Sequence, residues 1–230
     1  MSKLDLGNNE FINYEFHENI GKNTIVFSNS LGSDLSMWDP QAEYFKDDYQ
    51  IIRYDKRGHG KSSPIQGPYT FDMLENDVIS IMDEIGIDKV HFVGLSMGGM
   101  TSLGLALKHS NRFDKLVCCA ARADMPPPAI EAWDQRMAVV EDKGTQGVVQ
   151  GSLERWFSDK FRNDVANNHI LEKAEEMIKS TSTNGYIGSC NAIKGLDYLR
   201  ELGKIKKDFL YISGENDVGA PALALSLIHI

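Results

Sequence analysis

With 230 residues, 42% of them hydrophobic and 25% charged, the chain has the size and composition of one globular domain with room for an insertion. Its net charge of −9 argues against nucleic acid and anionic membrane surfaces as partners, and we expect no signal peptide and no membrane span. The 3 cysteines lack zinc-type spacing and no glycine-rich phosphate loop appears, which favours a reduced, cytoplasmic protein without metal or nucleotide cofactor.

Strands and helices alternate along the first half of the chain. Apolar and β-branched runs predict the strands, and apolar residues at helical spacing, with Thr70 as a cap, predict the helices. The expected strands are 11–16, 24–27, 50–54, 90–93 and 115–119, and the expected helices are 69–85 and 101–108. This alternation implies a mostly parallel sheet with helices on both faces, an α/β fold.

The alternation stops at the proline run 125–128. From residue 129 to about 192 the spacing predicts helices only, which we interpret as a lid over the carboxyl edge of the sheet; three ordinary packing helices are the alternative. Strand 208–213 then resumes the sheet. The expected division is a first part of the core at 1–124, the lid at 125–192, an incomplete second part of the core at 193–224, and a tail at 225–230.

The segment Gly94-Leu95-Ser96-Met97-Gly98 matches G-x-S-x-G, the nucleophile elbow, with a strand before it and a helix after it. Because Gly94 and Gly98 lack a Cβ, strand and helix can approach closely enough to hold Ser96 in a strained conformation that presents its hydroxyl. A serine attacks carbonyls slowly unless a base takes its proton and dipoles receive the oxyanion. Ser96 is therefore the candidate nucleophile of a hydrolase.

The other parts of such a site follow in the chain order Ser, Asp or Glu, then His. Asp217, just beyond the strand after the lid, is the candidate acid, and Asp124, after the preceding strand, is the alternative. The backbone amides of Leu31 and Met97 are the candidate donors of the oxyanion hole. No histidine stands where the base is expected, since His229 lies only a dozen residues after Asp217.

The remaining histidines precede the sheet core, lie within it or stand on the lid, and His59 is expected to be a satisfied loop histidine. They are His17, His59, His91, His109 and His169. Residues 225–230 read as one frame of the transposase mosaic-end adaptor CTGTCTCTTATACACATC. We interpret them as a non-native tail that replaces the last helix, the last strand and the catalytic histidine, and we expect a nearly inactive chain.

Six segments carry further motifs. They are 27–38 (FSNSLGSDLSMW), 53–60 (RYDKRGHG), 67–70 (GPYT), 94–100 (GLSMGGM), 133–137 (WDQRM) and 153–157 (LERWF). Together they resemble the 3-oxoadipate enol-lactonases of the α/β-hydrolase fold, over residues 11 to 221. Asn-Ser-Leu-Gly in place of the commoner His-Gly pair, with Glu-Arg-Trp-Phe in the lid, separates this family from generic esterases. The missing histidine segment is the departure.

The resemblance implies that the chain opens a small unsaturated lactone to 3-oxoadipate in aromatic-compound (protocatechuate or catechol) breakdown, through an acyl-enzyme on Ser96. Because this small-molecule substrate carries a carboxylate, the lid residues Arg136 and Arg155 are candidates to bind it with paired hydrogen bonds. Trp133 and Trp156 are candidates for apolar walls of the pocket. The alternative for all four is a solvated or purely packing role.

Two other functions remain open. A carboxylesterase or a carbon–carbon bond hydrolase could use the same scaffold, because the fold does not set the substrate. A ligand receptor that has kept the pocket and lost turnover is the third possibility, although an intact elbow is unexpected in a pure binder. The sequence predicts no oligomeric state.

Overall fold

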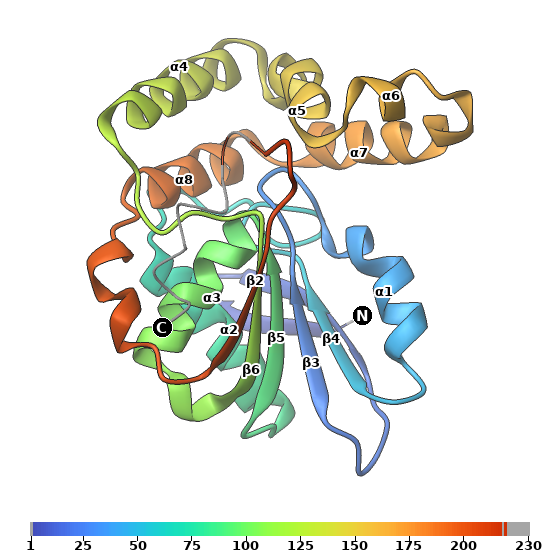
Figure 1. The fold of residues 1–230 in the computed structure, drawn as a ribbon, viewed down its shortest axis with the longest axis vertical. Coiled ribbons are helices and arrows are strands. Elements are labelled where there is room, and N and C mark those ends of the chain that lie inside the picture. Colours follow the sequence, from blue (N-terminus) through green and yellow to red (C-terminus); the bar gives the residue numbers. More distant parts are fainter. Residues whose placement is uncertain (1, 218, 220–230) are drawn as a thin grey trace.

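A computed structural model describes residues 2–217 and residue 219 of the chain, and within them seven strands form one sheet (Figure 1). The spatial order is β1-β2-β4-β3-β5-β6-β7. The strands are β1 (Ser2–Gly7), β2 (Glu10–His17), β3 (Thr24–Ser28), β4 (Gln50–Tyr54), β5 (Val90–Leu95), β6 (Phe113–Cys119) and β7 (Asp208–Ile212). β1 and β2 are antiparallel to their neighbours, and β4, β3, β5, β6 and β7 are parallel.

The mostly parallel sheet is confirmed, and burial explains why its central strands were predictable. All five residues of β3 are buried, as expected of a strand covered on both faces. The outer strand β1 was not expected, because its polar and charged residues give no continuous apolar run.

Helices lie on both faces of the sheet (Figure 1). On one face α2 (Phe71–Ile85) and α3 (Met97–Lys108) share an apolar cluster with the strands. On the other face η1 (Leu35–Trp38) and α1 (Asp39–Phe45) pack against β3 and β4. Thr70 caps α2 as expected, its hydroxyl oxygen accepting a hydrogen bond from the Met73 amide at 3.3 Å.

One helix begins earlier than its sequence pattern indicates. α3 starts at Met97 rather than at residue 101. The sequence pattern did not indicate this first turn because it contains Gly98 and Gly99, and glycine has a low intrinsic helix propensity. The α-helix therefore begins directly after Ser96, which places that residue at the positive end of the helix dipole.

Between β6 and β7 the chain forms a layer of helices above the carboxyl ends of the strands (Figure 1). The layer contains α4 (Pro127–Lys143), η3 (Thr145–Val148), α5 (Val149–Trp156), α6 (Asp159–Arg162), η4 (Val165–Asn167), α7 (Asn168–Ser180) and α8 (Thr183–Lys194). We keep the name lid for residues 125–192. Short 3₁₀ turns, η2 (Ser110–Arg112) and η5 (Leu199–Lys204), precede β6 and β7. The boundaries between core and lid stay predictions, and the expected tail at 225–230 lies outside the described residues.

Helix α8 attaches the lid to the core through glycines. A Cβ on Gly185 would lie 2.4 Å from Gly58 Cα, and a Cβ on Gly188 would lie 2.8 Å from the Tyr69 ring. Ser182 caps α8, and its hydroxyl donates a hydrogen bond to the Gly58 carbonyl at 3.0 Å. The lid therefore rests directly on the turn that follows β4.

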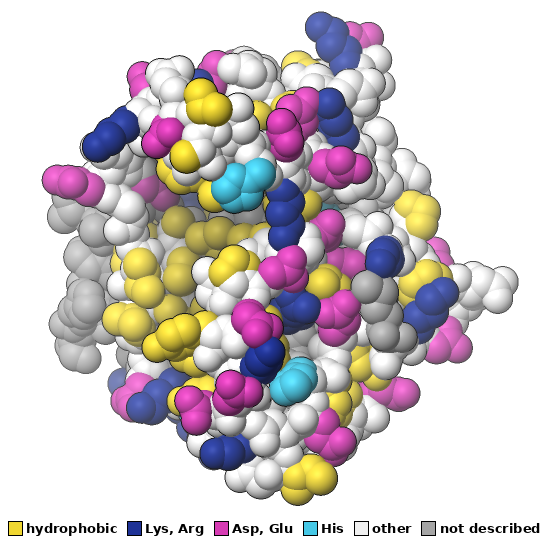
Figure 2. Space-filling view, turned by 90° about the vertical axis from the view of Figure 1, so that its right-hand side faces the viewer, with side chains coloured by type: hydrophobic (Ala, Val, Ile, Leu, Met, Phe, Trp, Pro, Cys, Tyr) yellow, Lys and Arg dark blue, Asp and Glu magenta, His cyan; other side chains and the backbone are white. Residues whose placement is uncertain are grey.

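In the part of the chain that the structure describes, β7 is an edge strand with exposed apolar side chains. Leu210 is 56% exposed and Ile212 is 50% exposed. Figure 2 shows hydrophobic side chains gathered in a hollow below the helical layer. None of the described helices is both long and apolar enough to cross a bilayer.

Candidate active site

Ser96 occupies the turn between β5 and α3, half-buried, with φ 53° and ψ −111°. A positive φ is rare for a residue other than glycine. The Ser96 amide donates a hydrogen bond to the Cys119 carbonyl at 2.8 Å, and its carbonyl accepts one from the Met100 amide at 2.8 Å. Strand β6 and helix α3 thus hold the strained residue from both sides.

The two glycines of the motif have the steric role expected of them. A Cβ on Gly94 would lie 2.1 Å from the Gly98 carbonyl oxygen, and a Cβ on Gly98 would lie 2.2 Å from the Ser28 carbonyl oxygen. Distances this short exclude any residue with a side chain at positions 94 and 98. The elbow therefore touches not only its own strand but also the end of β3, where the loop expected to form the oxyanion hole begins.

Both candidate oxyanion donors are buried near this contact. Leu31 is 5% exposed and Met97 is 0% exposed. Met97 is the first residue of α3, so its amide has no intrahelical acceptor. Among the described residues, neither the Leu31 amide nor the Met97 amide donates a hydrogen bond to a protein group. Two uncommitted amides beside a strained serine are what an oxyanion hole requires.

The loop that carries Leu31 is attached to the turn after β4. The Gly32 amide donates a hydrogen bond to His59 Nε2 at 3.1 Å, and Lys56 Nζ donates one to the Asn29 carbonyl. The other ring nitrogen of His59, Nδ1, lies 2.9 Å from the Arg57 carbonyl oxygen. Burial lowers the pKa of Lys56 to about 7 and the pKa of His59 to about 4. His59 is the satisfied loop histidine that the sequence predicts.

Asp217, the candidate acid, lies in the turn after β7. Its amide donates a hydrogen bond to the Gly214 carbonyl at 3.1 Å, and its carboxylate accepts one from the Gly219 amide at 2.9 Å. Its charge acts on the guanidinium of Arg155 in the lid. The structure thus brings the turn after β7 and the lid arginine into one electrostatic environment.

Asp124, the alternative acid, has a different setting. Its carboxylate lies 3.5 Å from the guanidinium of Arg122, and its backbone pairs with Asp197 in an isolated β-bridge. A carboxylate that already has an arginine partner is less available to orient an imidazole. This favours Asp217, and both assignments stay predictions.

The two lid arginines differ in how far their hydrogen bonds are already used. Arg136 Nε donates to the Tyr186 hydroxyl at 2.5 Å, and a terminal nitrogen of Arg136 donates to the Ser152 hydroxyl. The Arg136 guanidinium also lies 5.8 Å from the Trp133 ring and 5.6 Å from the Tyr186 ring, within reach of cation–π attraction. Arg136 is therefore largely committed to contacts within the lid, which the sequence pattern did not reveal.

Arg155 has no such partners. Among the described residues it makes no hydrogen bond and no ion pair. Its side chain is exposed to solvent, yet desolvation by the surrounding protein lowers its pKa, and the charge of Arg136 lowers it further. Among the described residues Arg155 is thus a lid cation without a hydrogen-bonded or ion-paired partner, and Asp217 is one of the charges that act on it.

Aromatic residues of the lid lie directly on the loop after β3. A Cβ on Gly32 would lie 3.4 Å from the Tyr186 ring and 4.0 Å from the Trp156 ring. Trp133 and Trp156 pack against the same apolar cluster that contains Leu31 and Met97. The structure therefore gathers the candidate wall residues and the candidate oxyanion donors around one apolar core. Tyr186, which joins them, was missed because nothing in its local sequence marks it.

None of the described histidines is placed to serve as the base. His17 pairs with Ile51 at the opposite, amino end of the parallel strands, and His59 uses both ring nitrogens. His91 is five residues before Ser96 on β5, a separation of about 16 Å along a strand. His109 ends α3, about 18 Å along the helix from Met97.

The fifth described histidine, His169, is exposed on α7 in the lid. His229 lies outside the described residues. Ser96, Asp217 and the two amides stay candidates for their roles, and none of the described histidines is a candidate for the base.

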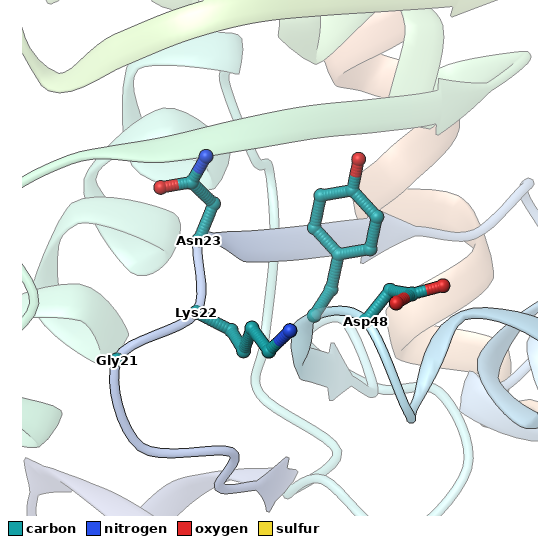
Figure 3. Close-up of a pocket in the computed structure, with 5 residues that line it drawn as sticks. Gly21, Lys22, Asn23 and Asp48 are labelled. Atoms are coloured by element: carbon teal, nitrogen blue, oxygen red, sulfur yellow. The ribbon is translucent and has the colours of Figure 1, made fainter.

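The residues described contain no cluster of three or more side chains that could hold a metal ion. A shallow hollow of about 410 Å³ lies at the amino ends of β3 and β4, lined by Gly21, Lys22, Asn23, Asp48 and Tyr49 (Figure 3). Ser96 follows the carboxyl end of β5, so this hollow is at the opposite edge of the sheet and is not part of the candidate site.

Known proteins similar to this chain point in the same direction. The family model for the alpha/beta hydrolase fold matches residues 23–228. The 3-oxoadipate enol-lactonase 2 of Acinetobacter baylyi is 36% identical over 206 residues, which cover 90% of this chain and 76% of that protein. The 3-oxoadipate enol-lactonase 1 of the same organism is 37% identical over 193 residues, with 84% and 71% covered.

Solved structures agree with this similarity. The crystal structure of the enol-lactonase from Burkholderia xenovorans LB400 superposes with a TM-score of 0.87 at 34% sequence identity. That match covers 94% of this chain and 83% of the Burkholderia chain.

Proposed function

Because the chain belongs to the alpha/beta hydrolase family and is a carboxylic ester hydrolase of the enol-lactonase type, we propose that it opens 3-oxoadipate enol-lactone to 3-oxoadipate in the breakdown of aromatic compounds. The observation that carries this proposal is the strained backbone of Ser96 beside two uncommitted amides. The names of the similar enol-lactonases support the choice of substrate.

The proposed reaction begins when Ser96 Oγ attacks the carbonyl carbon of the lactone and its hydroxyl proton passes to water or to a base in the buffer. The amides of Leu31 and Met97 stabilise the oxyanion of the tetrahedral intermediate. Its collapse breaks the carbonyl carbon–ring oxygen bond, and the departing enolate takes up a proton on carbon to become the ketone. Water then attacks the acyl carbonyl, the bond to Ser96 Oγ breaks, and Oγ takes back a proton as the acid is released. Asp217 is the acid that would orient a histidine base, and no described histidine occupies that position.

Recognition of the substrate's carboxylate is assigned to the lid. Arg155 is the stronger candidate, because among the described residues it makes no hydrogen bond and no ion pair. A planar guanidinium can hold a carboxylate with two parallel hydrogen bonds. Arg136 is the second candidate, although Tyr186 and Ser152 already use two of its nitrogens. Trp133 and Trp156 form the apolar walls in this proposal.

The absence of a base among the described residues leads to a further part of the proposal, slow turnover. A triad that lacks one member keeps about 10³–10⁴-fold catalysis over water, from the oxyanion hole and binding alone. We therefore expect ring opening by this chain to be slow and to depend on Ser96.

The test is a spectrophotometric assay of enol-lactone opening by the purified chain and by the Ser96→Ala variant. We expect slow ring opening that disappears in Ser96→Ala. Imidazole added to the buffer supplies a base and is expected to raise the rate of the unsubstituted chain but not of the variant. Equal rates in the two proteins, with and without imidazole, would refute the proposed nucleophile.

Two further measurements separate the competing functions. Faster hydrolysis of a simple aryl ester than of the enol-lactone would indicate a carboxylesterase. A fluorophosphonate probe that leaves Ser96 unlabelled even with imidazole added would indicate a ligand receptor.

The role of Arg155 is tested by Arg155→Gln, compared with Arg162→Gln as a control. Arg162 is also a lid arginine, but it already pairs with Asp159. We expect KM for the lactone acid to rise about tenfold or more in Arg155→Gln only, since a charge-assisted bond is worth about 1.5–3 kcal/mol. KM for the methyl ester of the lactone is expected to stay unchanged in both. An equal rise for acid and ester would contradict the assignment.

A further inference from the structure

The turn after β4 contacts the loop after β3 at three places. Lys56 Nζ donates a hydrogen bond to the Asn29 carbonyl, His59 Nε2 accepts one from the Gly32 amide at 3.1 Å, and the Asp55 carboxylate accepts one from the Leu35 amide at 2.8 Å. These contacts join residues that are 20 to 27 positions apart in the chain.

Two of these contacts hold the peptide groups immediately before and after the one that carries the Leu31 amide, the candidate oxyanion donor. The Asn29 carbonyl belongs to the peptide that joins residues 29 and 30, and the Gly32 amide belongs to the peptide that joins residues 31 and 32. The Leu31 amide belongs to the peptide between them. When both neighbouring peptide planes are fixed, the direction of the Leu31 N–H is restricted as well, because the planes share their Cα atoms.

The contact with the elbow fixes this loop relative to the nucleophile. Ser28, which precedes Asn29, lies so close to Gly98 that a Cβ there would be 2.2 Å from the Ser28 carbonyl oxygen. One end of the loop is thus held against the residues that follow Ser96. The other end depends on the turn after β4.

From these contacts we propose that Lys56 and His59 are positioning residues that aim the Leu31 amide at the oxyanion of the tetrahedral intermediate bonded to Ser96. This inference rests on the proposed function of Ser96 as a nucleophile. Neither residue touches the substrate, and each acts through one backbone group of the loop.

The chemistry of both side chains agrees with a positioning role. His59 accepts a hydrogen bond at Nε2, so that nitrogen carries no proton, and Nδ1 carries the proton donated to the Arg57 carbonyl. Burial lowers the pKa of His59 to about 4, which keeps the acceptor available at neutral pH. Lys56 is 1% exposed and burial lowers its pKa. An apolar side chain at this position would cost less free energy to bury.

The test uses pairs of variants that lose or keep one hydrogen bond. His59→Asn keeps a donor for the Arg57 carbonyl but is too short to reach the Gly32 amide, whereas His59→Gln can offer that amide an oxygen. Lys56→Met removes the donor to the Asn29 carbonyl, whereas Lys56→Gln keeps an N–H. Ser62→Ala is the control, because the buried Ser62 hydroxyl bonds only Asn13 and Asp55 and not the loop.

The first readout is the rate at which a fluorophosphonate labels Ser96. Loss of one oxyanion donor typically costs 10²–10³ in rate, so misdirecting it is expected to slow labelling by about tenfold or more in His59→Asn and Lys56→Met. The two Gln variants are expected to recover most of the rate, and Ser62→Ala is expected to keep it. Labelling of both loss variants at the parent rate, with folding shown by circular dichroism, would overturn the proposal.

The second readout needs no variant and no reactive serine. In the parent chain the Gly32 amide is expected to exchange with deuterium at least about tenfold more slowly than the Leu31 amide, since only Gly32 has an acceptor. Equal exchange of the two amides would overturn the proposal even if a variant failed to fold. A parent chain that is not labelled even with imidazole added would instead refute the nucleophile.

Discussion

At Ser96 the backbone is held at φ 53°, a conformation that costs a residue with a Cβ roughly 1–3 kcal/mol. Glycine adopts positive φ without this cost. We therefore expect Ser96→Gly to raise the free energy of unfolding by about 1 kcal/mol, measured by urea denaturation, while fluorophosphonate labelling is lost. Stability rises because the strain is relieved, and labelling is lost because glycine has no hydroxyl.

Ser96→Ala is the matched control for this prediction. It removes the same hydroxyl but keeps the Cβ, so the strain remains and no stabilisation is expected. If the glycine variant proved no more stable than the alanine variant, the backbone at this position would not be strained.

Lys56 provides a second prediction at the scale of one residue, with a pH dependence. Burial lowers its pKa from 10.5 to about 7, so between these values the unfolded chain binds more protons than the folded chain. Stability therefore rises as pH increases through this window, and the cost of the buried ammonium is complete below about pH 7. Lys56→Met is expected to stabilise the fold at pH 6 and to gain less at pH 9.

The size of this effect follows from two opposing contributions. A shift of this size corresponds to an upper limit of about 5 kcal/mol, and leaving the Asn29 carbonyl unpaired costs about 1–3 kcal/mol. We expect a net gain of about 2 kcal/mol at pH 6 in urea denaturation. A gain that is the same at both pH values would show that the ammonium is not the cause.

At the scale of secondary-structure elements, the attachment of α8 to the core depends on glycine contacts. A Cβ on Gly185 would lie 2.4 Å from Gly58 Cα, where neither backbone can move without shifting the helix. We expect Gly185→Ala to lower the free energy of unfolding by about 2 kcal/mol or more and to make the lid sensitive to limited proteolysis.

Gly151 offers a control on another lid helix. A Cβ there has no neighbour within 4 Å, so Gly151→Ala is expected to stabilise α5 by about 0.5–1 kcal/mol. If both alanine variants lost stability equally, close packing of α8 would not explain the effect.

These elements also show what the sequence could predict. Strand β4 is predicted to the residue and α2 to within two residues at its start, because local apolar spacing and a cap define them. The contact of α8 with Gly58 was not predicted, since residues more than a hundred positions apart leave no local pattern. The hydrogen bonds of Arg136 to Tyr186 and of Lys56 to Asn29 were not predicted either, because residues 50 and 27 positions apart also leave no local pattern.

The candidate site also has a part that the sequence could predict and a part that it could not. The elbow was predictable because Gly94, Ser96 and Gly98 lie within five consecutive residues, and the structure confirms its backbone geometry. The difference between the committed Arg136 and the unpaired Arg155 depends on tertiary contacts, so the sequence treated both alike.

At the scale of the whole molecule, two properties act in opposite directions on association between chains. A net charge of −9 favours repulsion, whereas Leu210 and Ile212 expose apolar surface on β7, the edge strand of the described part of the sheet. Exposed apolar edge strands pair readily with other chains, and lysine on an edge opposes this pairing. We therefore expect the chain to associate at high concentration and ionic strength, and Leu210→Lys to shift it toward monomer in sedimentation velocity.

Tyr44→Lys separates the edge from simple surface hydrophobicity. Tyr44 is 79% exposed on α1 and takes no part in the sheet, so its replacement changes the net charge equally without altering β7. Association at the edge predicts a shift in Leu210→Lys only. An equal shift in both variants would mean that added charge or lost apolar area alone governs association, and that the edge position of β7 has no part in it.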